Sequence, residues 1–186
     1  MKTLKDIIEG IKIQKIVGDI NITIDNISNN SNHITTSGLF IAKKGNRVDG
    51  HTFIDSAINN GAIAVVCSDD VDLPENITKI VVEDSTEAEC YLAANFYDNP
   101  SKKLKIIGVT GTNGKTTTAT LIYQLLNNLG QKAGLISTII YKYGNVELPS
   151  INTTPDAIEL NKLMNDMYLD GCKYAVMEVS SHAIVQ

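Results

Sequence analysis

Residues 109–118 read VTGTNGKTTT, which combines glycines, a lysine and hydroxyl groups in an order that suits phosphate binding. Gly111 and Gly114 lack a Cβ atom, so the backbone there can approach phosphate oxygens closely. Lys115 supplies a positive charge for the β- and γ-phosphates, and Thr116 takes the position at which a P-loop hydroxyl meets Mg²⁺. An apolar stretch before the glycines and a helix after them would aim backbone N–H groups at the anion. The stretch therefore predicts a phosphate-binding loop with a magnesium ligand.

The loop departs from the common P-loop pattern, which has a glycine five positions before the glycine of the Gly-Lys-Thr triplet. In this chain that position is Val109. A P-loop kinase would have glycine there, so the departure disfavours a kinase. The alternative without a ligand is a glycine turn with a solvated lysine. The preceding strand, the following helix and the three consecutive threonines Thr116–Thr118 argue against that alternative.

A second chemical feature is Glu178, which ends the apolar run YAVME at residues 174–178. Ligands of open parallel sheets gather at the carboxyl ends of the strands, so this carboxylate could reach an ion held by Thr116. Burying a carboxylate without a cation is costly, which favours a magnesium ligand over a strand-end ion pair with a lysine. Serines and a histidine follow at residues 180–182, but no aspartate is placed to complete a Ser-His-Asp triad. Hydrolase chemistry is therefore disfavoured.

Two segments carry helix-start signals. In INTTPDA, residues 151–157, Thr154 could be the N-cap and Pro155 the first helical residue. This N-terminus would either bind a second anion or serve only as a cap. A capping box at Ser85 predicts the start of another helix, which stops before Pro100.

Helices and strands alternate along the chain, which predicts an α/β fold with two domains. Residues 99–103, NPSKK, form the best linker candidate. We predict a small α/β domain over residues 1–102 and, over residues 103–186, the first part of a P-loop-type domain with a mostly parallel sheet and helices on both sides. The predicted helices cover residues 3–11, 51–61, 85–99, a stretch after the loop that ends at Gly130, and 157–171. The predicted strands cover residues 20–27, 37–45, 62–68, 79–84, 104–109, 133–138 and 174–181.

Composition excludes several classes of protein. The 186 residues carry a net charge of −5 with a pI near 5.1, so the chain as a whole is not built to bind a nucleic acid. No apolar run reaches the roughly 18 residues of a membrane span, and charges interrupt the first residues, which disfavours a signal peptide. The cysteines, Cys67, Cys90 and Cys172, are odd in number and widely spaced, as expected for reduced thiols of a cytoplasmic protein.

Four segments together resemble the Mur ligase family: GVTGTNGKTTT, NTTPDA, MEVSSHA and the upstream GLFIAKKGNRVDGHTFIDSAINNGAIAVV. The resemblance covers essentially the whole chain and is strongest to the members that add the third residue of the peptidoglycan stem peptide. It implies a UDP-binding N-terminal domain, a central ATPase domain and a C-terminal Rossmann-like domain. The chain would hold the first and the start of the second, so we expect it to be a fragment. Valine at position 109 is usual in this family.

The resemblance also implies site residues. Those that would bind ATP form the loop Gly111, Thr112, Asn113, Gly114, Lys115, Thr116 and Thr117. Those that would bind the second substrate are Ser31, Asn46, Arg47 and Val48 at its UDP part, and Asn152, Thr153, Thr154, Ser180 and Gln186 along the path to its peptide end. Lys115 and Glu178 would be catalytic, and Thr116 and Glu178 would hold Mg²⁺. One departure concerns Ser31, because the family usually has Asp-Ser-Arg where this chain has Asn-Ser-Asn.

The reaction implied by the resemblance is an ATP-dependent, ADP-forming amide ligation. The carboxylate of UDP-N-acetylmuramoyl-L-alanyl-D-glutamate would attack the γ-phosphate of ATP, and the amine of an amino acid, diaminopimelate or L-lysine, would displace phosphate from the acyl phosphate. Such an enzyme would be a cytoplasmic monomer without nucleic-acid or membrane partners, and this chain alone would at most bind nucleotide. The alternatives are a folylpolyglutamate or cyanophycin synthetase-like ligase and a non-catalytic nucleotide-binding module.

Overall fold

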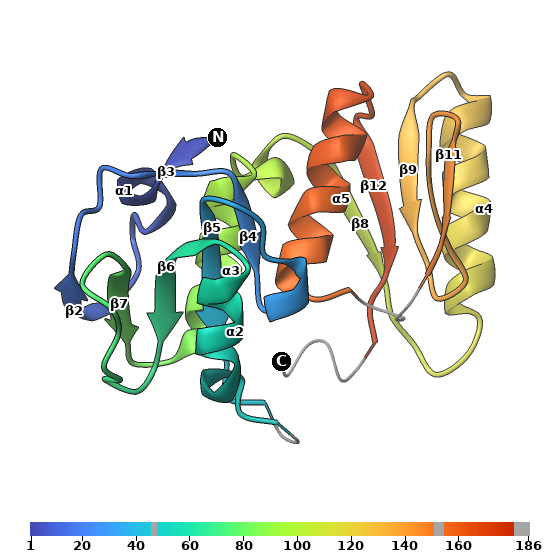
Figure 1. Ribbon diagram of the computed structural model, residues 1–186. Helices are drawn as coiled ribbons and strands as arrows, with labels where there is room; N and C mark the ends of the chain where they lie inside the picture. The colour runs from blue at the N-terminus through green and yellow to red at the C-terminus, as the bar shows by residue number, and fades with distance from the viewer. Residues whose placement is uncertain (46–47, 151–154, 181–186) are drawn as a thin grey trace. The chain divides into compact units, whose positions relative to one another are not determined.

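The computed structural model of the protein describes residues 1–45, 48–150 and 155–180 (Figure 1). The chain divides into two compact units, Met1–Phe96 and Tyr97–Gln186. The domain boundary predicted from the sequence, after residue 102, lies six residues beyond this division, at the end of a short 3₁₀ helix, η3 (Pro100–Lys102). Each unit has its own five-stranded sheet.

The first unit is built on a sheet with the strand order β2-β7-β6-β5-β4. Its four consecutive strands from β4 to β7 run parallel, and β2 pairs antiparallel with β7 at one edge. The bounds are β2 (Ile13–Val17), β4 (Asn26–Ser28), β5 (Gly38–Ala42), β6 (Ala62–Cys67) and β7 (Thr78–Val82), and a separate antiparallel pair is formed by β1 (Lys2–Thr3) and β3 (Thr23–Ile24). Every residue of β5 and β7 is buried, as expected for parallel strands that are covered on both faces.

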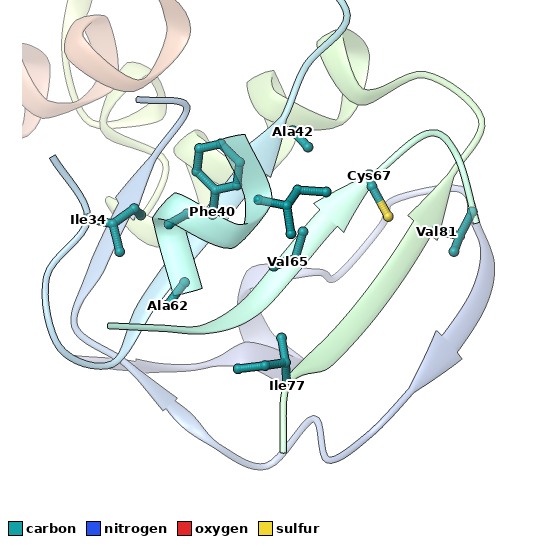
Figure 2. Close-up of a cluster of buried hydrophobic side chains, with 10 residues drawn as sticks. Ile34, Phe40, Ala42, Ala62, Val65, Cys67, Ile77 and Val81 are labelled. Carbon is teal, nitrogen blue, oxygen red and sulfur yellow. The ribbon is translucent and has the colours of Figure 1, made fainter. Parts of the chain in front are cut away.

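The apolar core of the first unit lies between the sheet and α2 (Ile54–Asn59), as Figure 2 shows. Phe40 of β5 and Val65 of β6 pack with Ile54 and Ala57 of this helix. Because side chains alternate along a strand, the neighbours of Phe40 face the opposite side, where α3 (Ser85–Phe96) packs against β5. The remaining helical turns are α1 (Leu4–Ile7), η1 (Ser31–His33) and η2 (Gly50–Phe53).

The second unit is built on a sheet with the strand order β11-β10-β9-β12-β8. The three strands β9, β12 and β8 are parallel, and β10 and β11 form an antiparallel hairpin that joins the sheet beside β9. The bounds are β8 (Lys105–Val109), β9 (Ala133–Ile136), β10 (Ile140–Tyr143), β11 (Val146–Pro149) and β12 (Tyr174–Glu178). The central strand β12 is buried over its last four residues, so its carboxyl end lies inside the unit.

Two helices cover opposite faces of this second sheet (Figure 1). α4 (Lys115–Asn128) places Ala119 against Val176, whereas α5 (Ala157–Leu169) places Met167 among Ala175 and Met177. Ala175 and Met177 of β12 thus face α5, and Val176 between them faces α4, which is the period-2 alternation of side chains in a strand. The predicted mostly parallel sheet with helices on both sides is confirmed, as is the α/β fold class.

Several local predictions are wrong at element ends. The helix predicted over residues 3–11 is only α1 (Leu4–Ile7), and Gly10 follows with a φ of 77°. The cap of α3 is Asp84 instead of Ser85, since its carboxylate accepts the N–H groups of Thr86 and Glu87 at 2.7 and 3.2 Å. Gly10 therefore lies beyond the end of α1, and Asp84 sets the start of α3.

The start of α5 and the region before it also differ from the prediction. The N-cap of α5 is Asp156, whose carboxylate accepts the N–H of Glu159 at 2.8 Å, so the cap predicted at Thr154 is wrong by two residues. The hairpin β10–β11 was not predicted, and its two-residue turn, Gly144–Asn145, is the signal that marks it. The strand predicted over 20–27 is divided into β3 and β4.

The helices and thiols can be compared with the expectations from composition. Within the described residues, no helix combines the length and apolar character that crossing a membrane requires. The cysteines are free, and Cys67 and Cys172 are buried. Burial raises the pKa of the Cys67 thiol to about 11, so this group is protonated and unreactive at neutral pH.

Candidate phosphate-binding site

The loop between β8 and α4 has a backbone that glycine adopts most easily at two positions. Gly111 has a φ of 147°, and Gly114, the N-cap of α4, has a φ of 79°. A Cβ atom at Gly114 would meet no heavy atom within 4 Å, so the glycine is needed for its conformation and not for lack of space. The two glycines turn the chain sharply from the strand end into the helix.

The N-terminus of α4 is suited to an anion. No side chain caps this helix, and the N–H of Thr118 forms its first internal hydrogen bond, with Gly114 O at 2.9 Å. The N–H groups of residues 115–117 precede that bond and lie at the positive end of the helix dipole. An N-terminus of this kind, entered from a glycine-rich loop, is a common phosphate site in α/β proteins.

Lys115 is the first residue of α4, and its side chain folds back over the preceding loop. Its Nζ donates hydrogen bonds to Gly111 O at 2.8 Å and to Thr112 O at 3.4 Å. These carbonyl oxygens are neutral acceptors at the rim of the loop, so the ammonium group can exchange them for charged phosphate oxygens. The lysine is therefore held close to the helix N-terminus without being neutralised by them.

Glu178, at the carboxyl end of β12, is fully buried. Its Oε2 accepts hydrogen bonds from the hydroxyl of Thr116 at 3.0 Å and from the hydroxyl of Thr138 at 3.1 Å. Its Oε1 accepts a hydrogen bond from the backbone N–H of Thr138 at 2.9 Å. Among the residues that the structure describes, no lysine or arginine forms an ion pair with it. A buried carboxylate with hydrogen-bond donors but no neutralising charge is a candidate cation ligand.

An open pocket of about 780 Å³ brings these groups together. This volume lies in the range of roughly 300–1,000 Å³ that is usual for small-molecule sites. The residues that line the pocket are Thr110, Gly111, Thr112, Asn113, Gly114, Lys115, Thr116, Thr138, Glu178 and Ser180. It lies at the carboxyl ends of β8, β9 and β12, where a parallel α/β sheet binds ligands.

The side chains in the pocket fit Mg²⁺. This ion takes oxygen ligands, and it binds through one or two protein groups together with substrate phosphates and water. The Thr116 hydroxyl and the Glu178 carboxylate are such groups. Their oxygens are 3.0 Å apart, so both could bind the same ion. The register of the parallel strands, with Glu178 opposite Val109, positions the carboxylate beside the start of the loop.

Most predicted ATP-site residues lie at this pocket, and Thr117 lies exposed in the first turn of α4. Thr138 also lines the pocket, although no sequence motif predicts a site role for this residue. The available signal was its place just after β9, at the same sheet edge as Glu178. Ser180, predicted for the second substrate, lines this pocket as well.

Of the other residues predicted to bind the second substrate, the structure describes Ser31 and Val48, which both belong to the first unit. Ser31 is buried in η1 of the first unit, and Val48 is exposed after β5. Both follow the carboxyl ends of adjacent parallel strands, β4 and β5. The residues that lie outside the described part of the chain are Asn46, Arg47, Asn152, Thr153, Thr154 and Gln186.

A cluster in the first unit, Asp49, His51 and Asp69, has the residue types of a metal site but different geometry. The Nδ1 of His51 is 2.6 Å from Asp49 Oδ1, and its Nε2 accepts the N–H groups of Ser68 and Asp69 at 3.2 and 3.3 Å. Both ring nitrogens are thus engaged in fixing the loops. Hydrogen bonds from His51, first from its backbone N–H, hold the pKa of Asp49 below its ordinary value.

Two family models match the chain. The model of the Mur ligase family, catalytic domain, matches residues 23–103, and that of the Mur ligase middle domain matches residues 109–186. The second match begins at the last residue of β8 and includes the phosphate loop and Glu178. The two matches together account for most of both units.

Curated relatives and solved structures are similar over nearly the whole chain. A protein of Phocaeicola vulgatus named UDP-N-acetylmuramoyl-L-alanyl-D-glutamate--2,6-diaminopimelate ligase is 47% identical over 98% of this chain and 38% of that protein. A solved structure of an enzyme with this name is 27% identical, with a TM-score of 0.77, over 100% of this chain and 37% of that one. The MurF ligase of Thermotoga maritima in complex with ADP is 27% identical, with a TM-score of 0.59, over 84% of this chain and 32% of that one. The chain therefore spans under two fifths of the length of these proteins.

Proposed function

The chain belongs to the Mur ligase family, and on that premise we propose that it supplies the ATP site of an amide ligase in peptidoglycan synthesis. The proposed substrates are ATP, a UDP-N-acetylmuramoyl dipeptide and an amino acid, which is 2,6-diaminopimelate in the names of relatives. The observation that carries the proposal is the hydrogen bond of 3.0 Å between the Thr116 hydroxyl and the buried Glu178 carboxylate. It joins, beside a glycine-rich loop, the two oxygen groups that commonly hold the magnesium of a bound nucleotide.

In the proposed complex, the N–H groups at the start of α4 receive the phosphates of ATP. Lys115 leaves the carbonyl oxygens of Gly111 and Thr112 and donates to the β- and γ-phosphates. Thr116 and Glu178 hold Mg²⁺, which neutralises phosphate charge when it is bound. The ADP in the related MurF structure supports a nucleotide at this kind of site.

The proposed reaction has two steps. A carboxylate oxygen of the dipeptide forms a bond to the γ-phosphorus, and the bond from that phosphorus to the β,γ-bridging oxygen breaks, so ADP leaves and an acyl phosphate remains. The amine of the amino acid then forms the amide bond at the acyl carbon, phosphate leaves, and the nitrogen loses a proton. Both partners of the first step are anions, so the main contribution of Lys115 and the helix N-terminus is to offset their repulsion and stabilise the developing charge.

The first unit has a proposed role in binding the UDP part of the substrate. Ser31 and Val48 follow adjacent parallel strands, which is where α/β sheets bind ligands. The domain assignment, the substrate residues outside the described part of the chain, the monomeric state and the cytoplasmic location remain predictions. The net charge of −5 supports the absence of a nucleic-acid partner.

Calorimetry of ATP binding with Mg²⁺ tests the proposed site. Because the chain spans 38% of the length of the relative from Phocaeicola vulgatus, binding is the step to measure on this chain. We expect Lys115→Ala to weaken binding by about 10- to 100-fold, since a charge-assisted hydrogen bond contributes about 1.5–3 kcal/mol.

The matched control for this test is Lys162→Ala, which removes the same charge from an exposed position in α5 of the same unit. It should bind Mg-ATP as the unaltered chain does. Equal affinities of the Lys115 and Lys162 variants, or no detectable binding at millimolar ATP by the unaltered chain, would contradict the proposed site.

A further inference from the structure

The turn between β9 and β10 holds the Glu178 carboxylate with two groups of a single residue. The backbone N–H of Thr138 donates to Oε1 at 2.9 Å, and the hydroxyl of the same residue donates to Oε2 at 3.1 Å. Thr138 is 40 positions from Glu178 in the chain, so the contact is made by the fold and not by local sequence. Both oxygens of the carboxylate are therefore oriented by this turn.

The turn itself is fixed by Ser137, which is 1% exposed. Its Oγ donates to Ile140 O at 2.8 Å and accepts the N–H groups of Ile139 and Ile140 at 3.3 and 3.1 Å. Its own backbone N–H also donates to Ile140 O, at 3.1 Å. These hydrogen bonds between Ser137 and the backbone of Ile139 and Ile140 stabilise the conformation of the turn. Because Thr138 lies within the turn, the direction of its backbone N–H is fixed as well.

The two carboxylate oxygens consequently have different roles. Oε1 is held by a backbone donor whose position the turn determines. Oε2 is approached by two hydroxyls, those of Thr116 and Thr138, which can rotate their hydrogens and expose lone pairs. Oε2 is thus the oxygen that can exchange a hydrogen bond for a cation while Oε1 stays anchored.

We propose that Thr138 is a positioning residue for the metal ligand: its backbone N–H holds Oε1 of Glu178, and its hydroxyl keeps Oε2 directed at the Thr116 hydroxyl, where the cation of the nucleotide binds. This inference rests on the proposed function and adds to it a residue that acts through Glu178. The terminal torsion of a glutamate carboxylate is broad, so a hydrogen bond to Oε1 alone lets the carboxylate turn about that bond. The second hydrogen bond, from the Thr138 hydroxyl to Oε2, fixes the orientation in which Oε2 faces the loop.

A purely structural role for Thr138 makes a different prediction. If the residue only satisfied a buried carboxylate, its loss would lower the stability of the unit and affect nucleotide binding equally with and without metal. A positioning role separates the two conditions, because the loop and Lys115 bind phosphates without help from Glu178. The ratio of ADP affinities with and without Mg²⁺, the metal coupling, is therefore the quantity to measure.

The experiment compares ADP binding in EDTA and in Mg²⁺ for the unaltered chain, Thr138→Val and Thr138→Ser. Valine keeps the shape and the N–H but removes the hydroxyl, whereas serine retains the hydroxyl. We expect the valine variant to lose metal coupling by about tenfold, with metal-free affinity within about twofold of the unaltered chain, and the serine variant to restore the coupling. The control is Thr118→Val, the same exchange at an exposed position of α4.

The outcomes separate the inference from the function on which it rests. Metal coupling that is unchanged in Thr138→Val, equal losses with and without metal, or a serine variant as impaired as the valine variant would each overturn the positioning role while leaving the ATP site intact. An unaltered chain that binds no ADP in either condition overturns the proposed function and this inference together. Circular dichroism checks folding, and Thr138→Ala replaces the valine variant if that variant does not fold.

Discussion

Each unit of the protein buries one glutamate near the carboxyl ends of its parallel strands, and the two carboxylates are satisfied differently. Glu89 of α3 is 2% exposed, and it accepts hydrogen bonds of 2.6 Å from Lys43 after β5 and from Asn29 after β4. Glu178 receives hydroxyl and backbone donors, with no ion pair among the described residues. The comparison indicates that the first carboxylate is neutralised within the chain and stabilises the fold, whereas the second retains a charge for a cation.

The largest expected effect concerns the neutralised carboxylate. Lys43→Ala leaves Glu89 buried without its cation, which should lower the free energy of unfolding by about 3 kcal/mol, the lower end of the range for breaking a buried ion pair. The lower end applies because the Lys43 side chain is 29% exposed. Urea unfolding followed by circular dichroism measures the change. The exposed Lys162→Ala should differ from the unaltered chain by under about 0.5 kcal/mol, and equal losses in the two variants would break the comparison.

The next prediction exchanges each glutamate for its neutral isostere. Glu178→Gln should reduce the effect of Mg²⁺ on ATP affinity by about tenfold or more, while stability stays the same or rises, because a buried charge without a counter-ion is removed. Glu89→Gln should do the reverse, with a stability loss of about 1–3 kcal/mol and unchanged ATP binding. Calorimetry and urea unfolding measure the two properties. If Glu178→Gln is the less stable variant and keeps its metal response, the assignment of roles is wrong.

The smallest expected effect is a loss of stability of the first unit at acidic pH. The side-chain hydrogen bonds from Lys15 and then from Lys79 lower the pKa of Asp70 to about 2, from an ordinary value of 3.8. Because the folded-state pKa is the lower one, this contribution to stability is complete above pH 4 and is lost as pH falls from about 4 to about 2. Asp70→Asn should therefore reduce the fall in the urea midpoint over this pH range.

The matched control for the acid prediction is Asp25→Asn, the same exchange at an exposed position of the same unit. Amide signals in NMR spectra assign the acid-dependent unfolding to the first or the second unit. An Asp70 variant with the same pH dependence as the unaltered chain would show that its two lysine contacts, each 2.6 Å long, are not maintained in solution.

The residues of the phosphate loop could be predicted because their signals are local. Gly111 and Gly114 adopt positive φ angles, and Lys115 and Thr116 open the helix directly after them, so spacing alone indicates the site. Glu178 was predictable as the end of an apolar strand. Its burial follows from the two helices that cover the sheet.

Other features could not be predicted in the same way, since they depend on which of several local options the fold selects. Thr154 and Asp156 are both good N-cap residues, and the structure selects Asp156, whose extended backbone leads into α5. Thr138 carries no motif, and its importance comes from two hydrogen bonds to a residue on another strand. The partnership of Lys43 with Glu89 spans 46 positions and has no sequence signature either.

The sequence by itself determined the α/β alternation and the loop chemistry, since backbone conformation at glycine and the period of apolar residues are properties of short segments. The tertiary structure alone decided which carboxylate is free for a cation. Strand register places Glu178 opposite Val109 and its Oε2 3.0 Å from the Thr116 hydroxyl, 62 positions away, whereas packing of α3 brings Glu89 to Lys43. The physical reason is that burial and neutralisation of a charge depend on the groups packed around it, which distant segments supply.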